Sequence, residues 1–388
     1  MSRLMGGKRI GIITIVKVNN YGAELQAYAT QRKLNLMGYD AEIIDYLYYR
    51  NPGHVSERES SPFYPYPLKN RVKEIGLKVI DMLGRLRKTD EGCRRDESFA
   101  KFHRQYCRFS ENQYRRHSEL FGNPPVYDVY CVGSDQVWNP RCYTNLDAYF
   151  LDFAPEGKRR FSYGCSFGVK EIPESAKEAY ARYLSRIDRL SVRESTGVEL
   201  VRRLTGRKAK LVADPTLLLS RDEWMAVAEP VRDLPESYVL VYELHSTPYL
   251  MEVARDVARQ RGCKIVRISK DAHSGASADG DIVSITDAGP SQFVYLFDKA
   301  GVVVTNSFHG TAFSVNFRKE LFCVLSAAAT NNSRQESLLK RLGLEDRLLY
   351  DDVRRDIAAF DSIDYDAASE RLDALRAESV EYIKEAVE

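Results

Sequence analysis

Short apolar runs rich in β-branched residues recur along this chain and alternate with segments of helical length. The alternation begins with a strand at 9–15, a helix at 23–37 and a second strand at 41–46. Strands that are apolar on both faces are typical of parallel sheets covered by helices on both sides. Parallel strands joined through a helix take right-handed crossovers. The chain is therefore predicted to be an α/β protein built from doubly wound parallel sheets.

The alternation continues towards the C-terminus, and 388 residues suit two domains of ordinary size. We place the boundary near residue 190, which gives a Rossmann-like domain over 1–190, a second over 191–350 and a tail over 351–388. The two halves are expected to face each other across a cleft, with an amphipathic helix at 367–387 packing back on the first. Further strands are predicted at 126–132, 161–167, 190–193, 210–213, 238–242, 263–268, 302–304 and 321–324, and further helices at 173–186, 195–204, 248–260 and 291–299.

Charge and cysteine content argue against several functional classes. A formal net charge of +2 gives no indication of nucleic-acid binding, and no apolar run approaches the ~20 residues of a membrane-spanning helix. Residues 1–8 lead into a strand without the pattern of a signal peptide. Seven scattered cysteines form no C-x-x-C pair, and Asp279-Gly280-Asp281 lies in a Gly/Ser-rich loop. We expect a reduced, cytoplasmic protein that binds no nucleic acid and needs no metal.

Residues 69–116 carry an excess of positive charge, with 14 Lys and Arg against 7 Asp and Glu. Leu77, Ile80, Leu83 and Leu86 fall on one helical face of this segment, with Arg and Lys around them. One interpretation is a solvated helix face. The other is a patch for anionic lipid or a pyrophosphate-linked acceptor, which would make the protein peripheral at the inner surface of the cytoplasmic membrane.

The segment 301–313 contains the first candidate for catalysis. Val302 to Val304 indicates a buried strand, and the small polar residues after it favour the start of a helix. Such a turn lies at the carboxyl edge of a parallel sheet, where α/β folds bind ligands and a helix N-terminus attracts anions. His309 follows this turn, and histidine is the side chain whose ordinary pKa lies nearest neutrality. His309 is predicted to be catalytic, and a core histidine that caps the helix is the alternative.

Two other strand-to-helix turns, at 19–22 and 133–138, carry groups that suit a polyhydroxylated sugar. Asp135 is predicted to orient a sugar hydroxyl or act as its general base, and Trp138 to stack on a pyranose ring. Core packing of Trp138, and capping or helix-surface roles for Asn20 and Gln26, are the alternatives. If the three turns converge, they line one interdomain pocket. The predicted acceptor-binding residues are Asn20, Tyr21, Gly22, Gln26, Ser134, Gln136 and Trp138.

The same turns also suit an anionic donor on the side opposite the sugar. Binding an anion needs positively charged side chains. Arg193 ends a predicted strand, and its planar guanidinium suits a carboxylate or a phosphate. Arg334 lies just inside another predicted helix. Structural ion pairs are the alternative for both arginines. The predicted donor-binding residues are Arg193, Ser307, Phe308, Gly310, Thr311 and Arg334.

Five short motifs occur in order between residues 8 and 347: Asn20-Tyr21-Gly22-Ala23-x-Leu25-Gln26-Ala27-Tyr28-Ala29, Val132-Gly133-Ser134-Asp135-Gln136-Val137-Trp138-Asn139, Ser191-Val192-Arg193-Glu194, Asp214-Pro215-Thr216 and Ser307-Phe308-His309-Gly310-Thr311-Ala312-Phe313. Together they resemble the polysaccharide pyruvyl transferase family. The resemblance implies a GT-B-like fold of two Rossmann-like domains. It also implies transfer of the enolpyruvyl carbons of phosphoenolpyruvate onto two hydroxyls of one sugar, as a cyclic ketal, with release of phosphate.

By position, His309 resembles the family's histidine at the donor, Phe308 the residue whose backbone contacts phosphoenolpyruvate, and Arg193 the carboxylate- or phosphate-binding arginine. Some members carry Arg-Leu-His where this chain has Ser307-Phe308-His309, so one donor cation is missing, and Arg334 is the predicted substitute. The reaction needs an acid that delivers a proton to C3 of the enol, and a histidine titrating near neutrality suits that role.

The sequence thus predicts a ketal pyruvyltransferase that acts on a cell-surface polysaccharide or its lipid-linked precursor. Phosphoenolpyruvate is the expected donor substrate, and no cofactor is expected. Two alternatives stay open: a GT-B glycosyltransferase that uses a nucleotide sugar, and a non-catalytic glycan-binding protein.

Overall fold

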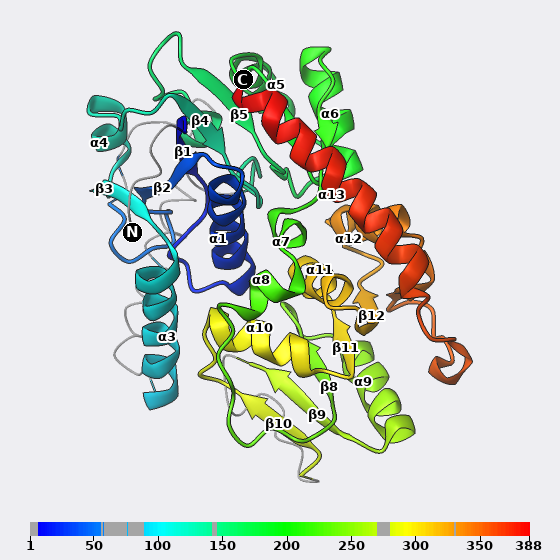
Figure 1. Ribbon diagram of the computed structural model, residues 1–388. Helices are drawn as coiled ribbons and strands as arrows, with labels where there is room; N and C mark the ends of the chain where they lie inside the picture. The colour runs from blue at the N-terminus through cyan, green and yellow to red at the C-terminus, as the bar shows by residue number, and fades with distance from the viewer. Residues whose placement is uncertain are drawn as a thin grey trace.

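A computed structural model of the chain describes residues 7–55, 57, 76, 89–141, 146–269, 280–329 and 331–388. Within these ranges the chain forms two large parallel sheets flanked by helices, one in the upper and one in the lower lobe of Figure 1. This arrangement confirms the predicted α/β, GT-B-like architecture. The predicted apolar face at Leu77, Ile80, Leu83 and Leu86 and the acidic residue Asp279 lie outside the described residues.

The first sheet has the strand order β3-β2-β1-β4-β5, and all its strands are parallel. Its central strands carry apolar residues that are buried on both faces, as the sequence indicates. The edge strand β3 was not predicted, because its polar sequence leaves three consecutive residues exposed. The bounds are β1 Arg9–Ile13, β2 Asp40–Tyr46, β3 Phe109–Tyr114, β4 Val129–Val132 and β5 Arg159–Ser162, with helices α1 Tyr21–Leu36, α3 Asp90–Tyr106, α4 His117–Gly122, η1 Leu146–Phe150 and α5 Glu174–Ser185.

The second sheet has the order β10-β9-β8-β11-β12-β13 and is also parallel throughout. Its two edge strands are short and were not predicted. The bounds are β8 Tyr238–Tyr242, β9 Lys264–Ile268, β10 Ile282–Ile285, β11 Val302–Thr305, β12 Glu320–Leu325 and β13 Leu348–Tyr350, with helices α9 Pro248–Arg261, α10 Pro290–Lys299, α11 Phe308–Asn316, α12 Ser333–Leu342, η2 Glu345–Arg347 and η3 Ile357–Ala359.

A small two-stranded parallel sheet lies in the chain between the two large ones. The strand predicted at 161–167 is shorter than expected, because Gly164 takes a positive φ of 63° and interrupts it. Beyond this turn Cys165 forms isolated bridges with Asp135 and Val192, which tie the small sheet to the first lobe. The bounds here are β6 Ser191–Val192, β7 Lys210–Leu211, α6 Ser195–Thr205, α7 Pro215–Leu218 and α8 Arg221–Met225.

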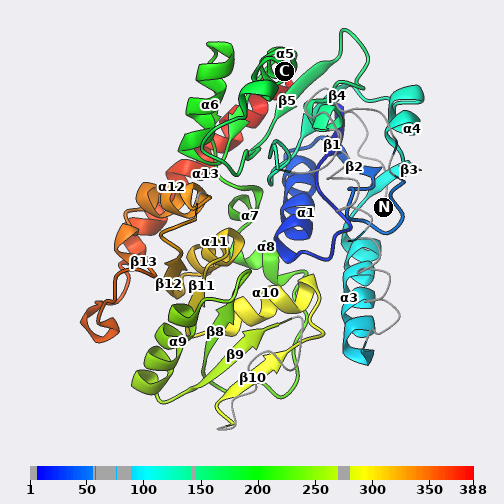
Figure 2. The ribbon, with the colours of Figure 1, turned by 180° about the vertical axis from the view of Figure 1, so that it is seen from behind.

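The last helix, α13 (Tyr365–Val387), runs along one side of both lobes (Figures 1 and 2). Near its start, Arg371 donates a hydrogen bond to the carbonyl of Leu342, at the end of α12. Near its end, the hydroxyl of Tyr382 donates to the carbonyl of Ser162 in β5 over 2.8 Å. The prediction that the tail helix packs back on the first lobe is therefore confirmed.

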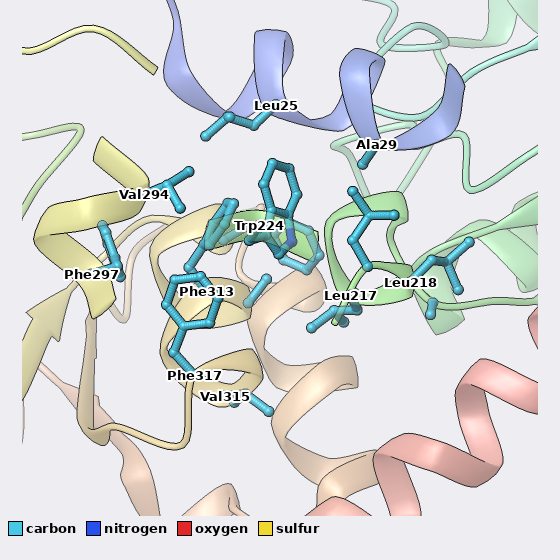
Figure 3. Close-up of a cluster of buried hydrophobic side chains, with 14 of the residues drawn as sticks. Leu25, Ala29, Leu217, Leu218, Trp224, Val294, Phe297, Phe313, Val315 and Phe317 are labelled. Atoms are coloured by element: carbon cyan, nitrogen blue, oxygen red, sulfur yellow. The ribbon is translucent and has the colours of Figure 1, made fainter. Parts of the chain in front are cut away.

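Part of the contact between the lobes is a continuous hydrophobic core (Figure 3). Leu25 and Ala29 of α1 face Trp224 of α8, whose ring lies 4.9 Å from that of Phe313 in α11. The indole of Trp224 is fully buried, and its Nε1 donates to the carbonyl of Thr216 over 3.0 Å. Because this core joins residues of both lobes, it holds the polar part of the interface in a fixed geometry.

Candidate active site

The predicted strand–turn–helix unit around His309 is present. The strand β11 is buried along its whole length, and Ser307 caps α11 by accepting a hydrogen bond at its hydroxyl from the Gly310 amide over 3.3 Å. His309 therefore sits in the first helical turn, at the carboxyl edge of the second sheet. Its side chain is 9% exposed.

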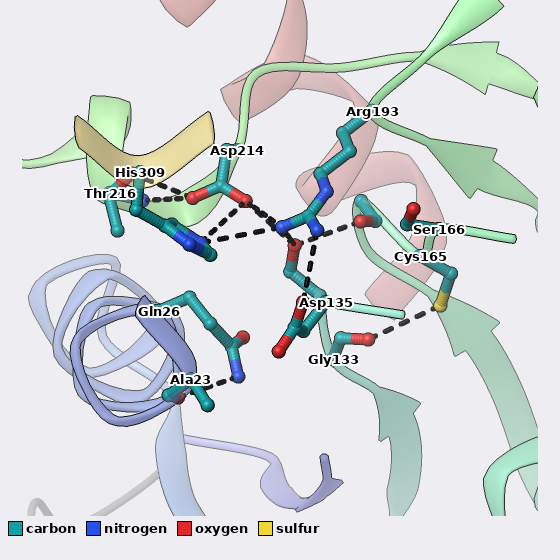
Figure 4. A network of polar contacts seen from close by, with 12 residues as sticks. Ala23, Gln26, Gly133, Asp135, Cys165, Ser166, Arg193, Asp214, Thr216 and His309 are labelled. Carbon is teal, nitrogen blue, oxygen red and sulfur yellow. Dashed lines mark hydrogen bonds and ion pairs between the residues drawn. The ribbon is translucent and has the colours of Figure 1, made fainter. Parts of the chain in front are cut away.

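The imidazole of His309 lies beside a buried ion-pair network (Figure 4). Arg193 is fully buried, and its Nη1 donates to Asp214 Oδ2 over 2.7 Å while Nη2 donates to Asp135 Oδ1 over 3.1 Å. His309 Nε2 is 3.5 Å from Arg193 Nη1 and 3.8 Å from Asp214 Oδ2. The hydroxyl of Ser134 lies within 2.9 Å of Asp214 Oδ2. Residues that follow β4, β6 and β11 thus converge.

Asp214 was not among the predicted site residues, although its motif was recognised. It caps α7, and its Oδ1 accepts hydrogen bonds from the amide and hydroxyl of Thr216 over 3.0 and 2.7 Å. Burial alone would raise the pKa of Asp214, but the charges of Arg193 and His309 and the bonds from Thr216 lower it to about 2. An aspartate before Pro215 is typical of a helix cap, and only the fold places it against Arg193.

The environment of His309 differs from the predicted one in its electrostatics. Burial disfavours the charged ring, Asp214 favours it and Arg193 opposes it, and the net result is a pKa of about 4. The expectation of a pKa near neutrality is therefore wrong for the free protein, in which His309 is neutral at pH 7. Gly22 of α1 covers the ring, since a Cβ at that position would lie 1.9 Å from His309 Nδ1. Gln26, one turn along α1, is buried and points towards the same space.

Arg334, the second residue of α12, is a buried cation that forms no ion pair with the described residues. The part of the chain that the structure describes offers it neither an ion pair nor a hydrogen bond, and its Nε is buried without a partner. Burial and the nearby charge of Arg193 lower its pKa to about 10, although the carboxylates of Glu194, Asp135 and Asp214 act in the opposite direction. The ring of Phe308 lies 4.5 Å from the guanidinium carbon of Arg193 and 6.0 Å from that of Arg334. Two arginines therefore flank the residue that precedes His309.

The buried carboxylate of Glu194 follows Arg193 and was not predicted. Its Oε1 accepts hydrogen bonds from the Ser166 hydroxyl and the Phe167 amide over 2.9 and 3.0 Å. Burial raises its pKa, although the charges of Arg193 and Arg334 act in the opposite direction. Glu194 thus holds the loop after β5 against the arginines.

Several predicted binding residues lie elsewhere. Trp138 cannot stack on a sugar in this structure, because its ring is fully buried and stacks on Phe150 at 5.4 Å. Tyr21 joins the lobes instead, since its hydroxyl donates to the carbonyl of Ala288 over 2.8 Å. The side-chain oxygen of Gln136 accepts a hydrogen bond from Asn139 over 2.7 Å.

The residues after His309 in α11 also serve packing and not the site. The amide of Gly310 is used by the Ser307 cap, and a Cβ on Gly310 would lie 2.4 Å from Thr305 Oγ1. Thr311 is fully buried and donates to the carbonyl of Ser307 over 3.0 Å. Both were predicted to bind the donor, and both instead face the interior because they follow His309 around the helix.

Asn20 caps α1 and is exposed, and with Tyr21 it lines an interlobe cavity of about 660 Å³.

Within the described ranges no cluster of three His, Cys, Asp or Glu side chains is placed to hold a metal ion. Among the helices in those ranges, none combines the length and apolar character needed to cross a membrane.

Comparison with known proteins adds a family and a fold. A family model described as polysaccharide pyruvyl transferase matches residues 20–326. A search of curated proteins gives no significant match. The structure is similar to a UDP-GlcNAc 2-epimerase from Methanocaldococcus jannaschii, with a TM-score of 0.50, 10% identity and coverage of 94% of this chain and 92% of that one.

Two glycosyltransferase structures show weaker similarity over nearly the whole chain. The glycotransferase of kitacinnamycin has a TM-score of 0.42 and 13% identity, and covers 97% of this chain and 96% of its own. An α-glucosyltransferase in complex with UDP and DNA has a TM-score of 0.48 and 9% identity, with coverage of 98% and 95%. At these identities structural similarity bears on the fold alone.

Proposed function

The chain belongs to the polysaccharide pyruvyl transferase family, and we propose that it transfers pyruvate from phosphoenolpyruvate to two hydroxyls of one sugar as a cyclic ketal. The acceptor would be a cell-surface polysaccharide or its lipid-linked precursor. One observation carries this proposal: a buried histidine lies beside an Arg–Asp network, and an arginine that forms no ion pair with the described residues lies 6.0 Å from the ring of the preceding Phe308. A small donor with two anionic groups matches this arrangement.

Arg334 is the group best suited to bind the donor. Arg193 already shares its guanidinium between Asp135 and Asp214, whereas a buried guanidinium without an ion pair remains costly until an anion reaches it. Position 307 carries a serine that caps α11, so it supplies no positive charge. Arg334 would therefore take the place of the arginine that other family members carry at that position.

His309 would act as the general acid once the donor is bound. It is neutral in the free protein, and the carboxylate and phosphate of phosphoenolpyruvate would favour its protonated form by direct charge interaction. The imidazolium would then give its proton to C3, which becomes a methyl group and leaves C2 electrophilic. Such proton transfer contributes about 10²- to 10⁴-fold to a rate.

Two C–O bonds then form at C2 and one breaks. The first sugar hydroxyl adds to C2, phosphate departs, and the second hydroxyl closes the ketal. The two hydroxyl protons balance the one gained by C3 and the one that leaves with the phosphate. Asp135, whose carboxylate is 16% exposed while that of Asp214 is fully buried, would accept a hydroxyl proton. Its φ of +76° is a strained conformation for an aspartate and is typical of functional positions.

We propose that residues 1–190 form the acceptor side and residues 191–350 the donor side. The protein would be cytoplasmic and would reach a membrane-bound acceptor from the inner surface. Fractionation of cells into soluble and membrane material would test the location. The donor and acceptor sides would be tested by chemical-shift or exchange mapping with phosphoenolpyruvate and with a glycan.

The reaction itself is tested with purified protein, phosphoenolpyruvate and a panel of glycans. We expect phosphate release that depends on the glycan, a ketal methyl signal in the product, and a larger increase of Tm with phosphoenolpyruvate than with a nucleotide sugar. A larger increase with the nucleotide sugar, without phosphate release, would instead indicate a glycosyltransferase. Glycan binding that survives joint substitution of His309 and Arg193, without turnover, would indicate a binding protein.

A further inference from the structure

A second group of cations lies in the interlobe cavity of about 660 Å³, outside the Arg193–Asp214 network. The cavity is bounded by the start of α1, by α3, by the carboxyl ends of β8 and β9 and by α9. Among the described residues, three arginines and a single carboxylate, Glu243, line it. Glu243 forms an ion pair with Arg267. Among the described lining residues, Arg95 and Arg255 therefore carry the positive charges that no carboxylate of the cavity pairs with.

Arg95 in α3 is the strongest sign of a ligand. It is 8% exposed, its Nε is buried without a hydrogen-bond partner, and within the described ranges no carboxylate forms an ion pair with it. Its guanidinium carbon lies 5.2 Å from the ring centre of Tyr21 and 5.7 Å from that of Phe99. Burying a charge is costly unless an opposite charge or hydrogen-bond acceptor meets it. The neighbouring Arg94, by contrast, is exposed and paired with Asp287.

Arg255 on α9 adds a second cation on the other side of the cavity. It is exposed, and the described chain provides no hydrogen bond or ion pair for it. Apolar side chains share the lining, and one of them, Leu244, is 46% exposed. A group that carries adjacent negative charges and an attached apolar or aromatic portion fits this combination.

The start of α1 lies at both the cavity and the proposed active site. Asn20 and Tyr21 line it, and the next residue, Gly22, packs on His309. On the second lobe, Asn306 beside the Ser307 cap fixes the loop after β8, accepting from the Leu244 amide and donating to the His245 carbonyl, each over 2.8 Å. A ligand held by Arg95 and Arg255 would therefore extend towards His309.

We propose that this cavity binds the diphosphate of a glycosyl diphosphate acceptor, so that the attached sugar reaches His309. The inference rests on the proposed function, because it assigns the bound molecule the role of acceptor. A lipid diphosphate and a nucleoside diphosphate present the same charged group, and the experiment separates them.

Binding is measured by calorimetry on the full chain with inorganic pyrophosphate, farnesyl diphosphate and UDP, and with farnesol and uridine as phosphate-free controls. We expect the three diphosphates to bind and the two phosphate-free controls not to bind. Tighter binding of farnesyl diphosphate would indicate a lipid diphosphate, and tighter binding of UDP would indicate a nucleoside diphosphate. Arg95→Met, which keeps the packing on Tyr21, and Arg255→Met on the surface should each weaken binding at least about tenfold. Arg94→Met and Arg259→Met, on the same two helices, should leave it unchanged.

Phosphoenolpyruvate binding is measured on the same samples, and it should be unchanged in Arg95→Met and should not displace the diphosphate. The inference would be overturned if no diphosphate bound, if Arg95→Met and Arg255→Met both bound it as tightly as the wild type, or if phosphoenolpyruvate displaced it. Each of these results would leave the proposed function standing. Failure of the wild-type protein to bind phosphoenolpyruvate would overturn the proposed function, and with it the acceptor role of the cavity.

Discussion

The interface between the two lobes has an aromatic half and a charged half, and most side chains of both halves are buried. Around Trp224 and Phe313 the buried atoms are apolar, and the single indole N–H has a partner. Around His309 the buried groups are ionic, and Arg334 Nε and Gln26 Oε1 have no partner. Apolar burial stabilises the fold, whereas unmet polar groups oppose it. We infer that the aromatic half holds the lobes together, so that the charged half can keep unpaired charges available for a ligand.

Removal of the His309 imidazole should affect activity far more than stability. His309→Ala should lower the rate of ketal formation by about 10²- to 10⁴-fold, because the proton donor to C3 is lost. The free energy of unfolding should change by only about 1 kcal/mol, as for an average substitution. Phosphate release and urea denaturation measure the two effects. Full activity in this variant would remove His309 from the mechanism.

The opposite result is expected in the aromatic half. Trp224→Ala should lower the free energy of unfolding by about 3–5 kcal/mol, because it opens a cavity in the core shared by both lobes. Below its lowered Tm the folded variant should still bind phosphoenolpyruvate. The measurement is chemical denaturation followed by calorimetry at low temperature. An unchanged stability would show that this core does not hold the lobes together.

The charged half should make stability depend on pH. His309 titrates at about 4 in the folded protein against an ordinary 6.5, so between these values the unfolded chain binds a proton that the folded protein excludes. Stability is therefore gained as pH rises from about 4 to 6.5 and is lost as pH falls through this window. The full difference is about 3 kcal/mol. Denaturation of the wild type and of His309→Gln should show this slope only in the wild type, and parallel curves would contradict it.

The smallest effect is expected for the cation at the edge of the network. Arg334→Met should raise the KM for phosphoenolpyruvate about 10- to 100-fold with little change in kcat, because a charged hydrogen bond contributes about 1.5–3 kcal/mol. Arg341→Met, on the same helix, removes an exposed ion pair with Glu378 and should leave the KM unchanged. Steady-state kinetics measures the KM for phosphoenolpyruvate in both variants. Equal KM values in both variants would exclude Arg334 from the donor site.

Local pattern was sufficient for much of the fold. The buried runs that became β1, β8 and β11 are apolar on both faces, and this signal does not depend on distant partners. The edge strands β3, β10 and β13 were missed because they are short or polar. Trp138 was misplaced because a residue just after a strand can turn either into the core or towards the edge, and the sequence does not distinguish the two.

The site was predictable where the turn itself carries the chemistry. Arg193 directly follows β6 and His309 lies in the first turn of the helix after β11, so the carboxyl edges of the sheets bring them together. Asp214 and Arg95 gave no comparable signal, because one resembles an ordinary helix cap and the other an ordinary helix residue. The low pKa of His309 was also hidden, since it depends on burial by α1 from the other lobe.

Helix α13 connects the two lobes and restricts their relative movement. It is 23 residues long, is fixed to α12 through Arg371 and to β5 through Tyr382, and receives at its last turn a 2.8 Å bond from Lys8 to the Val387 carbonyl. Movement of one lobe away from the other would break at least one of these hydrogen bonds. An incoming donor would then meet Arg193, Arg334 and His309 already in register, so that little binding energy is lost to rearranging the protein.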